Sequence, residues 1–138
     1  MNLPTAADGL SAPTAPTGDR EQAAVTPAGA RHAVAELLRR AGIGLDGVTA
    51  ADALLITSEL VTNAIRHGGG VTGFRTGIAD GALHLSVSDA NPDTPVARSA
   101  EPEHPGGFGW PLIQRLAERV EITPLADGKT ITIVVRLT

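Results

Sequence analysis

The 138-residue sequence contains no cysteine, which excludes disulfide bonds and thiolate metal sites. Aromatic residues make up only 2% of the chain, so the core has to be built mainly from aliphatic side chains and alanine. There is no run of lysine or arginine and the net charge is −4, which argues against direct binding of nucleic acid. No apolar run approaches the roughly 20 residues of a membrane span, and the first residues do not resemble a secretory signal. We therefore expect a cytoplasmic protein with one domain and no membrane contact.

The first 25 residues differ in composition from the rest of the chain. They are rich in alanine, proline, threonine, glycine and aspartate, and they contain few large apolar side chains. Such a segment buries too little apolar surface to offset the entropy lost on ordering. We predict a disordered tail over residues 1–25 and a folded domain over residues 26–138.

From Thr26 onward the sequence alternates between helical and strand patterns. Thr26 is a typical helix N-cap and Pro27 suits the first helical position, so a helix is predicted from there to Gly42. The other predicted elements are a helix at about 48–67, strands at 71–78 and 82–89, a proline-rich loop at 91–104, a helix from about 109, and strands at 119–124 and 129–137. Asp-Gly pairs at both strand junctions are typical of hairpins. This order predicts an α+β two-layer sandwich with a mixed, mainly antiparallel sheet and about three helices on one face.

Three polar side chains recur at helical spacing in the second predicted helix. Glu59, Asn63 and His67 are four residues apart, so they share one face of an ideal helix. The core stripe is predicted on the opposite side, at Leu54, Val61 and Ile65. An amphipathic helix with a solvated polar face would give the same pattern. His67 is also near the helix C-terminus, where a cation is favourable, so a capping role competes with a ligand contact.

An aspartate ends the second predicted strand. Asp89 has the same parity as the apolar residues at 83, 85 and 87, which predicts that its carboxylate points to the buried face. A buried carboxylate needs hydrogen-bond donors. A role in organising the loop or capping a helix would supply them, and so would a ligand amine such as that of a purine.

Three glycines precede the third predicted helix. Gly106, Gly107 and Gly109 would let backbone N–H groups approach an anion, and the helix N-terminus adds positive potential there. Glycines before a helix are also ordinary loop residues, so this feature alone is weak evidence. The four histidines show no metal-binding spacing, and no serine lies in a nucleophile-elbow pattern.

Taken in order, these motifs resemble the histidine-kinase-like ATPase domains with the Bergerat ATP-binding fold. More narrowly, they resemble the small stand-alone anti-sigma factors and serine kinases of Gram-positive bacteria. Residues 59–68 match the N-box, residues 87–92 match the first glycine box in its aspartate-then-proline form, and residues 106–113 match the second glycine box. The resemblance covers about residues 26–138.

The resemblance implies a role for each motif residue. Asn63 would coordinate the Mg²⁺ that bridges the triphosphate, Glu59 would be the general base, and Asp89 would bind the adenine amine. The other nucleotide contacts would come from His67, Gly106, Gly107 and Gly109.

The function implied is that of an ATP- and Mg²⁺-binding regulatory protein of the anti-sigma factor type, which phosphorylates a serine on an anti-sigma antagonist. Its partners would be a sigma factor or the antagonist, and family members of this size are often homodimers. The alternative is a non-catalytic interaction module that sequesters such a partner. One departure keeps both readings open, because Pro105 and Phe108 stand where the subgroup often has a basic residue. Only His104 lies near.

Overall fold

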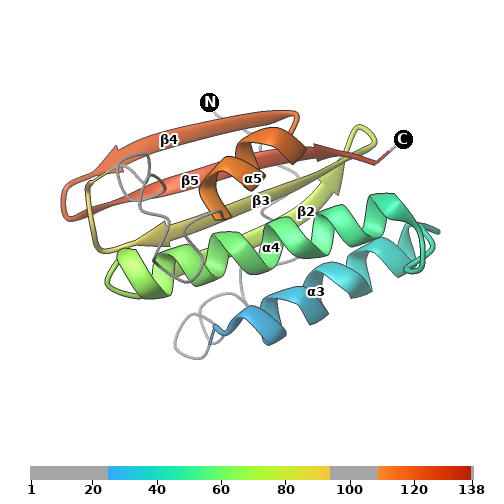
Figure 1. Cartoon of the computed structure of the whole chain (residues 1–138), viewed down its shortest axis with the longest axis horizontal. Coiled ribbons are helices and arrows are strands. Elements are labelled where there is room, and N and C mark those ends of the chain that lie inside the picture. The colour runs from blue at the N-terminus through green and yellow to red at the C-terminus, as the bar shows by residue number, and fades with distance from the viewer. Residues whose placement is uncertain (1–24, 94–108, 138) are drawn as a thin grey trace.

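The structure, a computed structural model, describes residues 25–93 and 109–137. The chain order of its elements is α3, α4, β2, β3, α5, β4 and β5 (Figure 1). Their bounds are α3 Pro27–Arg40, α4 Val48–His67, β2 Val71–Ala79, β3 Ala82–Asp89, α5 Gly109–Leu116, β4 Arg119–Leu125 and β5 Gly128–Arg136. The predicted tail, apart from Val25, lies outside the described residues, as do Gly106 and Gly107.

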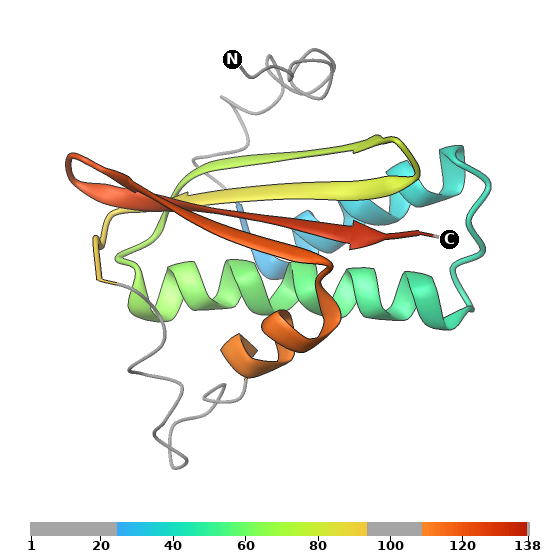
Figure 2. The same cartoon turned by 90° about the horizontal axis from the view of Figure 1, so that it is seen from above.

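The four strands form one sheet in the order β2-β3-β5-β4, and each neighbouring pair is antiparallel. The helices of the described residues lie on one face of this sheet (Figure 2). The prediction of an α+β two-layer sandwich is therefore confirmed, with antiparallel pairing throughout the described strands. Asp80 and Gly81 join β2 to β3 with φ angles of 55° and 72°, the left-handed conformation that a two-residue type I′ hairpin requires.

The face of the sheet away from the helices carries hydroxyl side chains in cross-strand pairs. Ser86 in β3 lies 3.0 Å from Thr132 in β5, and Ser88 lies 2.7 Å from Thr130, each measured between side-chain oxygens. Such pairs stabilise neighbouring strands without burying apolar surface.

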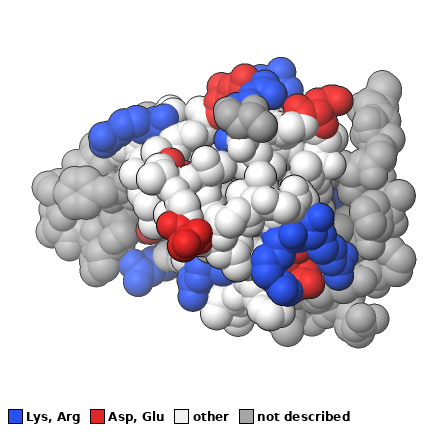
Figure 3. All heavy atoms as spheres, turned by 90° about the vertical axis from the view of Figure 1, so that its right-hand side faces the viewer, with Lys and Arg blue, Asp and Glu red and all other residues white. Residues whose placement is uncertain are grey.

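Local sequence sets the start of α3 and the end of α4 as predicted, whereas α3 ends at Arg40 with Ala41 as its C-cap rather than at Gly42. The Thr26 hydroxyl accepts a hydrogen bond of 3.0 Å from the backbone N–H of Gly29, and Pro27 is the first residue of α3. α4 ends at His67 with Gly68 as its C-cap. Basic side chains gather at the C-terminal end of α3, where Arg39 and Arg40 both pair with Glu36 (Figure 3).

α4 is the central helix of the core, and it contacts α3, α5, β2 and β3. Its buried residues are Ala50, Ala53, Ile56, Thr57, Leu60, Val61 and Ala64. The predicted core stripe was therefore partly wrong, since Ile65 is 45% exposed and Leu54 is only half-buried. The reason is that α3 and α5 cover the two sides of α4, which turns the buried face toward Asn63 and Glu59 rather than directly away from them. These two polar residues consequently border the core.

α4 also has a length and an apolar composition that would suit a membrane span. Contrary to the expectation from the sequence, its 20 residues are long and apolar enough to cross a bilayer by length and composition alone. The central helix of a soluble core can have the same length and composition. Its contacts with helices and strands on several sides account for its apolar character.

Candidate functional site

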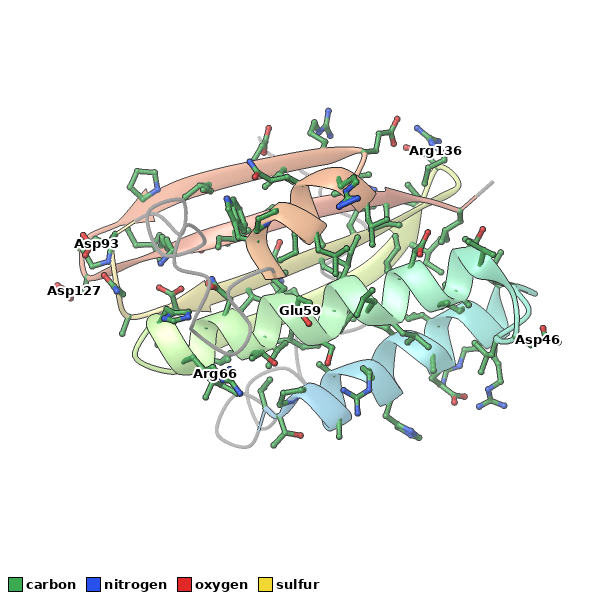
Figure 4. The ribbon with its side chains drawn as sticks, in the orientation of Figure 1. Asp46, Glu59, Arg66, Asp93, Asp127 and Arg136 are labelled. Atoms are coloured by element: carbon green, nitrogen blue, oxygen red, sulfur yellow. The ribbon has the colours of Figure 1, made fainter. Side chains whose placement is uncertain are left out.

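The polar residues of α4 line a small hollow against the first turn of α5. Glu59, Asn63 and His67 are all half-buried, and Figure 4 shows Glu59 along the middle of the helix and Arg66 near its C-terminal end. The lining residues are Glu59, Thr62, Asn63, Arg66, His67 and Gly109. The hollow measures about 10 Å³, which is room for about one water molecule. The structure thus brings four of the predicted site residues together in a closed arrangement.

Gly109 permits the contact between α4 and α5. It is the first residue of α5, and a Cβ atom at this position would collide with Oε1 of Glu59. The Glu59 carboxylate therefore approaches the N-terminus of α5, where the helix dipole favours negative charge. The neighbouring Trp110 is 5% exposed, and its indole N–H has no acceptor among the described residues.

Asp89 points to the buried face, as its parity predicted, and is 3% exposed. Its Oδ1 accepts a hydrogen bond of 3.0 Å from the backbone N–H of Asn91. The ammonium group of Lys129 lies 3.0 Å from Oδ2 and 3.2 Å from Oδ1, and both side chains of this ion pair are 2% exposed. Asp89 therefore organises the loop that follows it, which was one of the two roles considered from the sequence.

Hydrogen bonds fasten the end of β3 to the end of α4. The backbone N–H of Ala90 donates to the Gly68 carbonyl at 2.8 Å, and the Asn91 side-chain amide donates to the His67 carbonyl at 2.7 Å. Gly68 allows this close approach, because a Cβ atom there would lie 2.5 Å from Cγ of Asp89. Asp89 consequently lies beside the end of α4 but does not line the hollow that contains Asn63.

Two basic residues of the site were missed from the sequence. Lys129 starts the inward-facing series of β5 and is the cross-strand neighbour of Asp89. Its spacing of two residues from Ile131 indicated an inward-facing side chain, but a lysine at a buried position was not expected. Arg66 follows Asn63 by three residues and brings a cation to the hollow.

A second, larger hollow of about 350 Å³ lies at the other end of the sheet, beside the β2–β3 turn. His84, Arg119 and Val134 contribute to its lining, together with the exposed ion pair between Glu118 and Arg136 at 3.0 Å. It contains none of the predicted site residues.

Comparisons with known proteins agree with the fold. Residues 20–135 match the sequence profile of the family described as "Histidine kinase-like ATPase domain". The chain is similar to the crystal structure of the RsbU and RsbW domains of Rv1364c from Mycobacterium tuberculosis, with 26% identity and a TM-score of 0.56 over 80% of this chain and 29% of that one. It is also similar to the histidine kinase domain of the Erythrobacter litoralis EL346 blue-light activated histidine kinase, with 26% identity and a TM-score of 0.47 over 64% of this chain and 48% of that one. The chain thus spans less than half of each of these structures, and no protein of curated function matches it.

Proposed function

The chain belongs to the histidine kinase-like ATPase family, and we propose on that basis that it binds ATP with Mg²⁺ where α4, the end of β3 and the start of α5 meet. The observation that carries this proposal is the convergence of Glu59, Asn63 and Gly109 on one hollow. These residues come from α4 and α5, which are separated in the sequence by the β2–β3 hairpin. They are also residues to which the family resemblance gives roles.

The chemistry of the donor set suits such a ligand. The amide oxygen of Asn63 is a hard ligand for Mg²⁺, which takes few protein ligands and keeps several waters. The N-terminus of α5 favours phosphate oxygens, and the indole N–H of Trp110 in its first turn is a buried donor that lacks an acceptor among the described residues. The size of the hollow, about 10 Å³, means that the triphosphate fits only when Glu59 and Gly109 separate.

Each residue then has a distinct task. Mg²⁺ would neutralise phosphate charge, and Asn63 is the residue that would hold it. Glu59 would accept the proton of a substrate hydroxyl, and Arg66 would bring positive charge to the transferred phosphoryl group. Asp89 would accept a hydrogen bond from the adenine amine. These roles rest on positioning and charge, which carry most of the work in phosphoryl transfer.

The regulatory role is the finer part of the proposal. We propose a cytoplasmic protein of the anti-sigma factor type that phosphorylates a serine on an antagonist protein and acts as a homodimer. The similarity to a structure containing an RsbW domain supports this branch of the family. The second candidate is a non-catalytic module that sequesters a sigma factor or an antagonist. It is favoured by Phe108 in the second glycine box and Pro105 just before it, because the subgroup often has a basic residue at one of these positions.

Calorimetric titration with ATP in the presence and absence of Mg²⁺ tests the binding site. Unmodified protein is expected to bind ATP more tightly with Mg²⁺, and Asn63→Ala is expected to remove that dependence. Ile65→Ala is the matched control, because Ile65 lies on the same helix and is 45% exposed outside the hollow. Binding of ATP that never responds to Mg²⁺ would refute the role of Asn63.

A phosphate-transfer assay separates the kinase from the module. Labelled ATP is incubated with the protein and candidate antagonists, and Glu59→Gln is expected to keep ATP binding while transfer falls by about a hundredfold or more. If unmodified protein binds ATP but transfers no phosphate to any candidate, the module is the better description.

A further inference from the structure

A buried lysine occupies most of the carboxylate that is proposed to hold the adenine amine. An ionised carboxylate offers about four lone-pair positions to donors. The backbone N–H of Asn91 takes one of them on Oδ1 of Asp89. The Lys129 ammonium donates to Oδ1 at 3.2 Å and takes a second position, and its ion-pair contact of 3.0 Å with Oδ2 covers a third. One acceptor position therefore remains for a ligand.

The lysine is held in this position by the backbone around it. Asp89 and Lys129 are directly opposite each other in the β3–β5 pairing. The ammonium group also donates to the Asn91 carbonyl at 2.7 Å, and the side chain is 2% exposed. Gly128 packs so closely against the Asp89 backbone that a Cβ atom there would collide with the Asp89 carbonyl oxygen. Displacing the ammonium would leave a charge buried without its partner, which is strongly unfavourable.

We propose that Lys129 determines base specificity by limiting Asp89 to a single further hydrogen bond. This inference rests on the proposed function, because it concerns the same nucleotide site. Adenine presents one amine donor on its Watson–Crick edge, which matches the one remaining acceptor position. Guanine presents N1–H and a 2-amino group side by side. It would have to leave one donor unpaired or displace Lys129, and both outcomes penalise the wrong base.

The first experiment uses unmodified protein and three nucleotides. ATP, inosine triphosphate and GTP are titrated by calorimetry with Mg²⁺ present, since inosine has the N1–H of guanine but lacks the 2-amino group. ATP is expected to bind most tightly, and inosine triphosphate about fivefold or more tightly than GTP. If Asp89 had two positions free, the additional donor of GTP would make GTP the tighter ligand of the two. That order, or equal binding, would overturn the inference.

The second experiment removes the lysine. Lys129→Met keeps the length of the side chain and frees two positions on Asp89, so GTP is expected to bind at least as tightly as inosine triphosphate. Arg136→Met is the matched control, because it removes the same charge from the exposed end of the same strand and should leave the order unchanged. A folded Lys129→Met protein that binds ATP and keeps the original order would contradict the inference. If Lys129→Met does not fold, as circular dichroism would show, the comparison on unmodified protein still decides.

The two proposals fail in different ways. Unmodified protein that binds none of the three nucleotides would refute the proposed function, and the specificity would fall with it. Unmodified protein that binds ATP but does not prefer inosine triphosphate over GTP would refute the specificity alone.

Discussion

The ion pair between Lys129 and Asp89 should be one of the most sensitive points of the fold. Its nitrogen–oxygen distance of 3.0 Å equals that of the Arg136–Glu118 pair on the same strand. The two pairs differ in burial, with side chains 2% exposed in the first and 45–50% exposed in the second. Comparing them isolates the effect of burial on the free energy of unfolding.

The expected magnitudes differ severalfold. Lys129→Met leaves the Asp89 carboxylate buried without its counter-ion, which costs about 3–5 kcal/mol. Arg136→Met removes an exposed pair, which is worth at most about 1 kcal/mol because water and salt screen it. At roughly 4–8 °C per kcal/mol, the first change should lower Tm by about 12 °C or more, and the second by no more than about 8 °C.

Urea denaturation followed by circular dichroism measures both losses, in low salt and in about 1 M NaCl. Salt should reduce only the loss caused by Arg136→Met. A double variant, Lys129→Met with Asp89→Leu, should recover much of the loss, because replacing both partners leaves no uncompensated charge. A loss of stability for Lys129→Met no larger than that for Arg136→Met would contradict the expected effect of burial. A double variant that loses the sum of two large single effects would contradict it as well.

Three further changes test separate features. Thr26→Ala should lower the free energy of unfolding by about 1 kcal/mol through loss of the N-cap bond, and a loss in urea denaturation below about 0.3 kcal/mol would show that this bond contributes little. Gly109→Ala should displace the Glu59 carboxylate, whose end is flexible, so Tm should change by only a few degrees. Because the triphosphate fits only when Glu59 and Gly109 separate, calorimetry should show ATP binding that is at least as tight as in unmodified protein, and clearly weaker binding would contradict that separation. Trp110 is the single tryptophan, and its fluorescence should change when ATP and Mg²⁺ are added, since the first turn of α5 has to leave Glu59. A constant emission spectrum at saturating ATP would contradict that movement.

The elements that the sequence predicted well are those controlled by nearby residues. The Asp80-Gly81 turn requires two left-handed residues, and the N-cap at Thr26 requires only a hydroxyl three residues before an N–H group. The inward orientation of Asp89 followed from the two-residue period of β3. None of these depends on what the rest of the chain does.

The features that escaped prediction depend on distant segments. Ile65 is exposed because α3 and α5 decide which side of α4 is covered, and both helices are set by packing rather than by the pattern of α4 itself. Lys129 meets Asp89 only through the pairing of β3 with β5, across 40 residues of sequence. The closeness of Glu59 to Gly109 likewise comes from the packing of α5 on α4. The site residues could be proposed from motifs, but their separation into a hollow and a buried ion pair could not.

The bonds that fasten the end of β3 to the end of α4 divide the site into two halves of unequal rigidity. Ala90 and Asn91 hold one half to the carbonyls of Gly68 and His67, and Lys129 fixes it to β5. The other half is α5, a helix of eight residues that rests on α4 mainly through side-chain packing. Amide hydrogens of β3 should therefore exchange with solvent far more slowly than those of α5. The half that contains Asp89 is therefore already assembled before a ligand binds. The part of the binding free energy that is used for rearrangement would go into moving one short helix, α5.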